Sequence, residues 1–158
     1  MLAVLSSIFV SLLLVSNVIA GKLLQIGEWV MPAGILAYPV TFLISDTIAE
    51  VYGRKITIRV IWLGFATSLL MVFIIFLAGI FPSAEFWENQ GAFDLILGSV
   101  PRIVFASMVA YLLSQHHDVI SFHIWKKYTK GKHLWLRNNA STVISQAFDT
   151  VVFVTIAF

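Results

Sequence analysis

The stretch VIWLGFATSLLMVFIIFLAGIF, residues 60–81, sets the class of this protein. It carries no charge, it is followed by Pro82, and it is long enough to cross a bilayer as one helix, which takes roughly 20 apolar residues. The whole chain is similar in character, with 59% hydrophobic and 11% charged residues and a mean hydropathy of +0.94. In soluble domains, about 45–50% of the residues are apolar and about 25% are charged. We therefore expect an all-α fold, a polytopic transmembrane helical bundle.

The length of 158 residues allows about five or six spans with short connections and leaves no room for a second, soluble domain. We expect one integral membrane domain over residues 1–158. Pro32 and Pro101 suit helix starts, and Pro39 should kink the second span. A short surface helix is expected over residues 93–97. The absence of cysteine excludes disulfides, thiolate metal sites and a cysteine nucleophile. The five predicted spans cover approximately residues 2–20, 31–51, 60–81, 101–125 and 137–158.

Basic residues are concentrated in two of the four connections between these spans. The second and fourth connections contain eight of them, whereas the first has Lys22 and the third has none before Arg102. Because cytoplasmic loops carry the excess of Lys and Arg, the N-terminus is expected in the cytoplasm. A fifth span would then end outside at Phe158 without a polar flank, so we expect that a further C-terminal span is missing. The eight basic residues are Arg54, Lys55, Arg59, Lys126, Lys127, Lys130, Lys132 and Arg137.

Polar side chains inside spans need a partner, a cavity or a function, because a charge at the bilayer centre costs at least about 2.5–3.5 kcal/mol. Asp46, Glu50 and Arg54 follow one another at four-residue spacing, which places them on one helix face near the inner mouth. This pattern fits a substrate or ion site, and it fits an interfacial ladder of ion pairs equally well.

A short repeat marks the last two spans. Residues 114–118 and 145–149 both read S-Q-x-x-D, so Gln115 with Asp118, and Gln146 with Asp149, share a helix face. Each Gln lies about 15 Å from the cytoplasmic charges at 1.5 Å per residue, because eleven residues separate Gln115 from Lys126 and nine separate Gln146 from Arg137. The two motifs could therefore form one polar pocket. The alternative is interhelical hydrogen bonding, typically about 0.6 kcal/mol per contact.

Further polar residues flank the spans. Asn138 and Asn139 open the last span with more polarity than a helix cap requires. Asn17, Lys22 and Arg102 form a polar set on the outer side. Arg102 could attract an anionic or electron-rich ligand, although snorkelling at a helix end is the more frequent case. His116 and His117 lack further ligands at suitable spacing, and no phosphate loop, triad or H-E-x-x-H motif occurs, so we predict no metal and no cofactor.

Taken together, these residues resemble the queuosine precursor transporter family, also called the vitamin uptake transporter or DUF165 family. The similarity runs along nearly the whole chain. The stretches that carry it are Ser16-Asn17 with Lys22, Pro32-Ala33-Gly34, Tyr38-Pro39-Val40-Thr41-Phe42-Leu43, Asp46, Glu50-Val51-Tyr52-Gly53-Arg54, Arg102, Ala106-Ser107, Ala110-Tyr111, Ser114-Gln115, Asp118, Trp135-Leu136-Arg137-Asn138-Asn139, Ser141-Thr142, Ser145-Gln146, Asp149-Thr150 and Phe153.

The resemblance implies a multi-pass importer in the bacterial inner membrane that takes up deazaguanine bases for queuosine synthesis or salvage. It also implies six spans and a fold like the S-components of energy-coupling-factor transporters. A carboxylate could accept both N–H groups on the Watson–Crick edge of such a base, and a carboxamide could bind its ring carbonyl. Aromatic side chains could stack on the ring. Candidates for stacking are Tyr38, Tyr111 and Phe148.

We therefore expect a transporter, and not an enzyme, with Gln115, Asp118, Gln146 and Asp149 in its pocket, supported by Asn138 and Asn139. Asp46 and Glu50 are further candidates, as are Asn17, Arg102 and Tyr38. One alternative is an S-component-like subunit that needs a separate energising module. Others are an intramembrane enzyme that uses the buried acidic pairs, and a structural subunit. The expected partners are the small-molecule base, the lipid bilayer and either a second copy or an energising module, with no nucleic acid.

Overall fold

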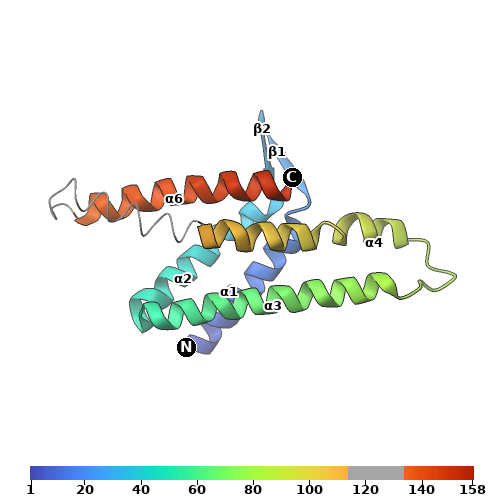
Figure 1. Cartoon of the computed structure of the whole chain (residues 1–158), viewed down its shortest axis with the longest axis horizontal. Helices are drawn as coiled ribbons and strands as arrows, with labels where there is room; N and C mark the ends of the chain where they lie inside the picture. Colours follow the sequence, from blue (N-terminus) through green and yellow to red (C-terminus); the bar gives the residue numbers. More distant parts are fainter. Residues whose placement is uncertain (114–133) are drawn as a thin grey trace. The chain divides into compact units, whose positions relative to one another are not determined.

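The structure of the chain, a computed structural model, describes residues 1–113 and 134–158 (Figure 1). It divides into two compact units, Met1–Val104 and Phe105–Phe158. A helix over residues 100–113 begins in the first unit and continues into the second. The expectation of an all-α transmembrane bundle is confirmed, with one small hairpin as the exception. The elements are α1 (Leu2–Ile19), β1 (Leu23–Ile26), β2 (Trp29–Pro32), the 3-10 helix η1 (Ala33–Leu36), α2 (Tyr38–Tyr52), α3 (Arg54–Ile80), α4 (Gln90–Leu97) and α6 (Leu134–Ala157).

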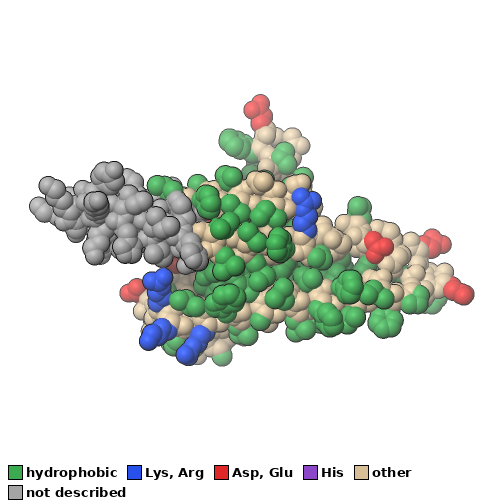
Figure 2. Space-filling model, in the orientation of Figure 1, with side chains coloured by type: hydrophobic (Ala, Val, Ile, Leu, Met, Phe, Trp, Pro, Cys, Tyr) green, Lys and Arg blue, Asp and Glu red, His purple; other side chains and the backbone are tan. Residues whose placement is uncertain are grey.

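Three of the described helices are long and apolar enough to cross a membrane, namely Leu2–Ile19, Arg54–Ile80 and Gln90–Leu113. The longest, α3, includes the apolar run of residues 60–81, and Phe73, Phe76 and Ile80 on it are each more than half exposed. Figure 2 shows hydrophobic side chains spread over this surface. Exposing such an apolar surface to water is unfavourable, whereas lipid tails are as apolar as these side chains and can cover it.

The core of the first unit lies where α1, α2 and α3 pack together. Phe9 and Leu13 of α1 meet Ile44 and Ile48 of α2 and Val60 of α3. Gly64 lets α1 approach α3, since a Cβ there would lie 2.8 Å from Leu13 Cδ2. Small residues at helix contacts are the usual means of close packing in membranes.

The start of the second span differs from the sequence prediction. Pro32 ends strand β2 and caps the 3-10 helix η1, and α2 begins only at Tyr38. Pro39 therefore lies in the first turn of α2 and causes no kink, because a first-turn residue needs no helical N–H partner. With 15 residues, α2 is about 22 Å long, which is shorter than the bilayer core of about 30 Å.

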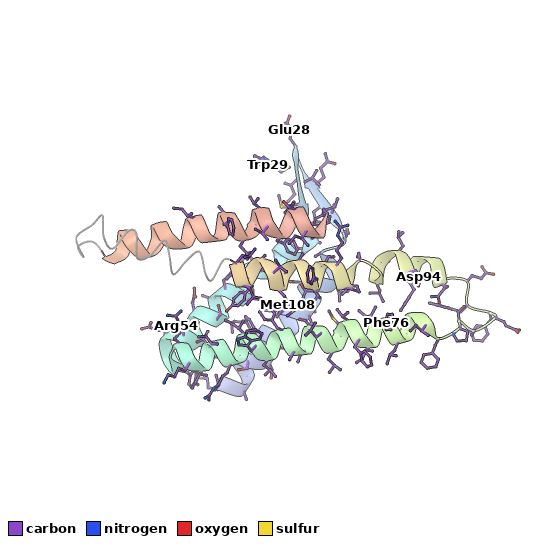
Figure 3. The ribbon with its side chains drawn as sticks, viewed as in Figure 1. Glu28, Trp29, Arg54, Phe76, Asp94 and Met108 are labelled. Carbon is purple, nitrogen blue, oxygen red and sulfur yellow. The ribbon has the colours of Figure 1, made fainter. Side chains whose placement is uncertain are left out.

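The hairpin before α2 was also missed by the sequence prediction. Its strands pair antiparallel with Leu23 opposite Pro32 and Ile26 opposite Trp29. Gly27 closes the turn at a φ of 64°, a conformation that glycine adopts without strain. Glu28 and Trp29 lie at its tip (Figure 3). A segment read as the entrance of a span is therefore a hairpin that extends beyond the end of α1.

The short helix expected over residues 93–97 is present as α4. The chain then turns at residues 98–99, and helical structure resumes at residue 100. Pro101 has no N–H to donate to the carbonyl of Leu97, which favours a break at this position. Ser99 Oγ donates a hydrogen bond to the Ile96 carbonyl at 2.9 Å within the turn.

Candidate functional site

Two buried polar side chains lie near the end of α1. Asn17 continues the inward-facing stripe of Phe9 and Leu13 by one turn, and Ser16 lies beside it. Their exposed fractions are 2% and 1%. Within residues 1–113 and 134–158, neither Asn17 Oδ1 nor Ser16 Oγ has a hydrogen-bond partner. A buried polar atom without a partner costs about 1–3 kcal/mol, so such a pair needs an explanation beyond packing.

Small residues bring other segments onto this end of α1. A Cβ at Gly34 of η1 would lie 3.1 Å from the Ser16 carbonyl oxygen and 3.4 Å from Ala20 Cβ. A Cβ at Gly21 would lie 2.9 Å from Ser99 Oγ, at the helix break. We call this region, residues 16–21 with 33–37, the α1–η1 junction. It encloses Ser16 and Asn17 because the backbones approach closely.

The sequence-predicted residues Tyr38 and Arg102 adjoin the same junction. The Ala33 N–H donates to the Lys22 carbonyl at 2.8 Å, which ties the hairpin to η1 just before Tyr38. Tyr38 is half-buried, and its ring centroid lies 6.1 Å from that of Phe42. Arg102 is exposed beside the buried Ile103. The structure thus brings Asn17, Tyr38 and Arg102 to one end of the first unit.

Asp46 and Glu50 lie elsewhere, on the exposed surface of α2. The expectation that Arg54 shares their helix face is wrong. The helix ends at Tyr52, Gly53 adopts a φ of 82°, and Arg54 begins α3. The change of direction at Gly53 interrupts the predicted ladder of ion pairs.

The second unit contains part of the predicted pocket. Gln146 and Asp149 lie one turn apart on α6, and Asn138 and Asn139 lie nearer its start. Asp149 is half-buried. Gln115 and Asp118 lie outside the described residues. The pairing of the two S-Q-x-x-D motifs therefore stays a prediction.

An open groove of about 360 Å³ runs between the end of α3 and α4. Its walls are apolar, with Phe76 and Ile80 on one side and Phe93 and Leu97 on the other. Asp94 also lines the groove (Figure 3). Its carboxylate accepts a hydrogen bond from the Gln90 side-chain amide at 2.9 Å. Among the residues that the structure describes, no sequence-predicted site residue lines this groove.

Ser16 was absent from the predicted site residues. Its neighbour Asn17 was included for its polarity at the end of an apolar run, and the same signal applies to Ser16. Small residues were a further signal, because they allow another segment to approach closely. They occur at Ala20-Gly21, one turn after Ser16, and at Ala33-Gly34. The burial itself depends on η1, which the sequence pattern did not reveal.

Long apolar helices, a lipid-facing surface and enclosed polar atoms at helix ends define a multi-pass membrane protein. Comparison with known families makes this more specific. Residues 32–158 match the model of the family described as "Putative vitamin uptake transporter". The chain belongs to this family.

Individual relatives agree with the family match. The chain is 34% identical over 126 residues to the "Probable queuosine precursor transporter" of Bacillus subtilis (strain 168), an alignment that covers 79% of this chain and 55% of the relative. It is 30% identical over 125 residues to the "Queuosine precursor transporter" of Escherichia coli (strain K12), covering 79% and 54%. The Haemophilus influenzae relative of the same kind is 30% identical over 127 residues, covering 79% and 51%.

The chain thus spans about half the length of the curated relatives it matches. No solved structure matches it. The family resemblance stated from the residues is confirmed, whereas the expected likeness to S-components stays a prediction.

Proposed function

We propose that the chain imports queuosine precursors, the deazaguanine bases, into the cytoplasm. The observation that carries this proposal is the 30–34% identity to three relatives that are named queuosine precursor transporters. The membrane-length helices supply the setting that such a function needs. The names of these relatives support a transport role, and we propose that the chain acts without catalysis.

The proposed substrate pocket uses the polar residues of the last two spans. The carboxylates of Asp118 and Asp149 would accept the N–H groups of the base, and Gln115 and Gln146 would bind its carbonyl. Asn138 and Asn139 would support the pocket from the inner side. The remaining candidates lie in the first unit and would line the route of the base. They are Asn17, Tyr38, Asp46, Glu50 and Arg102.

The proposed location is the bacterial inner membrane with the N-terminus in the cytoplasm. Arg54, Lys55 and Arg59 are exposed at the start of α3, whereas Glu85 and Glu88 are exposed after its end (Figure 2). The excess of basic residues on cytoplasmic loops favours this orientation.

The test is uptake of a labelled deazaguanine by cells without endogenous carriers. Asp149→Asn removes the negative charge from the acceptor, and Gln146→Ala removes the carboxamide, so each should lower uptake at least tenfold. Thr155→Ala is the matched control on α6, because Thr155 is exposed and its hydroxyl donates only to the Val151 carbonyl. Normal uptake by both site variants at normal expression would rule out this pocket. Absence of uptake by the unaltered chain would count against import, unless an added energising module restores it.

A further inference from the structure

The groove between α3 and α4 lies where α3 reaches the far boundary of the bilayer core. Arg59 is the last charged residue of α3, and Gly79, which lines the groove, follows twenty residues later. Twenty helical residues rise about 30 Å, which is roughly the thickness of the hydrocarbon core. Both walls of the groove belong to the first unit. The groove is therefore at the level where lipid tails meet headgroups.

The segment around α4 has the character of a membrane interface. The ring of Trp87 meets that of Phe93 edge-on, with the centroids 6.2 Å apart, and tryptophan is enriched at the headgroup level. Phe86 and Leu95 are exposed, each by more than four-fifths. Apolar side chains with this exposure, next to a membrane-length helix, are best covered by lipid. The groove thus opens onto lipid molecules.

The walls of the groove suit a hydrocarbon chain. Phe76 and Ile80 of α3 face Phe93 and Leu97 of α4, and these apolar side chains offer van der Waals contact to an apolar ligand. The volume of about 360 Å³ lies within the range of ligand pockets, about 300–1,000 Å³. Gly79 leaves room beside them, because no described atom lies within 4 Å of a Cβ built there.

Of the described residues that line the groove, only Asp94 carries a charge (Figure 3). Its Oδ1 accepts one hydrogen bond, from the Gln90 side-chain amide. An ionised carboxylate has about four lone-pair sites, so Asp94 can accept further N–H groups. The other charged residues within 60–101 are Glu85 and Glu88, and this stretch has no basic residue. The charges at the groove therefore favour a ligand with a positively charged group.

We propose that the groove binds one phospholipid with a primary-amine headgroup, a phosphatidylethanolamine. An acyl chain lies between Phe76 and Phe93, and the ammonium group donates hydrogen bonds to the Asp94 carboxylate. Such charge-assisted bonds are stronger than neutral ones. The quaternary ammonium of phosphatidylcholine has no N–H group, and the headgroup of phosphatidylglycerol has no cation. A second copy in the same orientation would bring the same acidic segment to this level, so like charges would meet.

The experiment measures lipid binding to the purified, delipidated chain in detergent by native mass spectrometry, with the dioleoyl forms of the three phospholipids. We expect one phosphatidylethanolamine per chain, bound about tenfold more tightly than the other two, because a hydrogen bond to a charged group is worth about that factor. Asp94→Asn should remove this preference. Glu88→Gln is the matched control and should keep it, since Glu88 is exposed and does not line the groove.

A second pair of variants tests the position of the acyl chain. Gly79→Leu places a side chain in the groove and should weaken the binding of phosphatidylethanolamine about tenfold, because the added atoms occupy the space of the lipid tail. Gly91→Leu on α4 should not, since Gly91 lies outside the lining and its Cβ would also meet open space. In lipid-free detergent, Gly79→Leu should unfold at the same temperature as the unaltered chain, so that weaker binding does not reflect misfolding.

Three results would overturn the lipid site: equal affinity for the three phospholipids, a preference that survives in Asp94→Asn, or unchanged binding in Gly79→Leu. A dimer that forms without lipid and is lost in Gly79→Leu would also overturn it, and would assign the groove to a second copy. No deazaguanine is present in this assay, so its outcome is independent of the proposed import.

Discussion

Gly64 is the residue on which close packing of α1 against α3 depends. A Cβ there would lie 2.8 Å from Leu13 Cδ2 and 3.2 Å from Phe9 Cε1. Gly64→Val should therefore push the two helices apart and lower the free energy of unfolding by about 1–3 kcal/mol. Thermal unfolding in detergent measures the change. Gly79→Val on the same helix is the control, because no described atom lies within 4 Å of a Cβ at Gly79. Equal stability of the two variants would contradict the packing.

The roles of Gly64 and Ser16 could not be predicted from the sequence. Gly64 lies in an apolar run, where glycine is common in membrane helices and carries no positional signal. Ser16 appears as a polar residue near a helix end, and only η1 makes it a buried atom without a partner. Depth along a helix follows from 1.5 Å per residue, but burial depends on which segment covers that turn.

The joint between α2 and α3 consists of Gly53 alone, with φ 82° and ψ 159°. This region of backbone conformation is essentially restricted to glycine, and other residues there cost about 1–3 kcal/mol. Gly53→Ala should therefore destabilise the first unit by that amount in thermal unfolding. Gly91→Ala in α4 should not, because its backbone is helical and no described atom lies within 4 Å of the added Cβ. If Gly53→Ala is as stable as Gly91→Ala, the joint does not require glycine.

Helices and strands differed in how well the sequence predicted them. The apolar run of residues 60–81 lies within α3 because its length suits only a helix in this composition. Trp29–Pro32 was read as part of a span, since four apolar residues look alike in a strand and a helix. The turn at Gly27-Glu28 was the available signal for a hairpin. Pro39 was expected inside the second span, where it would cause a kink. It lies in the first turn of α2, because this helix starts farther along the chain than predicted.

Across the first unit, charge follows the proposed orientation. Exposed Arg54 and Lys55 start α3, and the hairpin tip with Glu28 follows α1, whose other end is the N-terminus. The orientation itself stays a prediction, which rests on the order of the spans and the positions of the charges along the chain. The substrate pocket needs more, since Gln146 and Asp149 on α6 must face the fourth span. A shared depth on two helices does not determine which faces meet.

The orientation can be tested directly because the chain has no cysteine, so any introduced thiol is the single site of labelling. Glu28 and Lys55 are both exposed and lie outside the apolar runs. With the N-terminus in the cytoplasm, α1 carries Glu28 to the outer side, and α2 returns the chain to the inner side at Lys55. A membrane-impermeant maleimide should therefore label Glu28→Cys in intact cells and Lys55→Cys only after permeabilisation. The unaltered chain is the control and should take up no label. Labelling of Lys55→Cys in intact cells, with Glu28→Cys protected, would reverse the orientation and move the basic end of α3 to the outside.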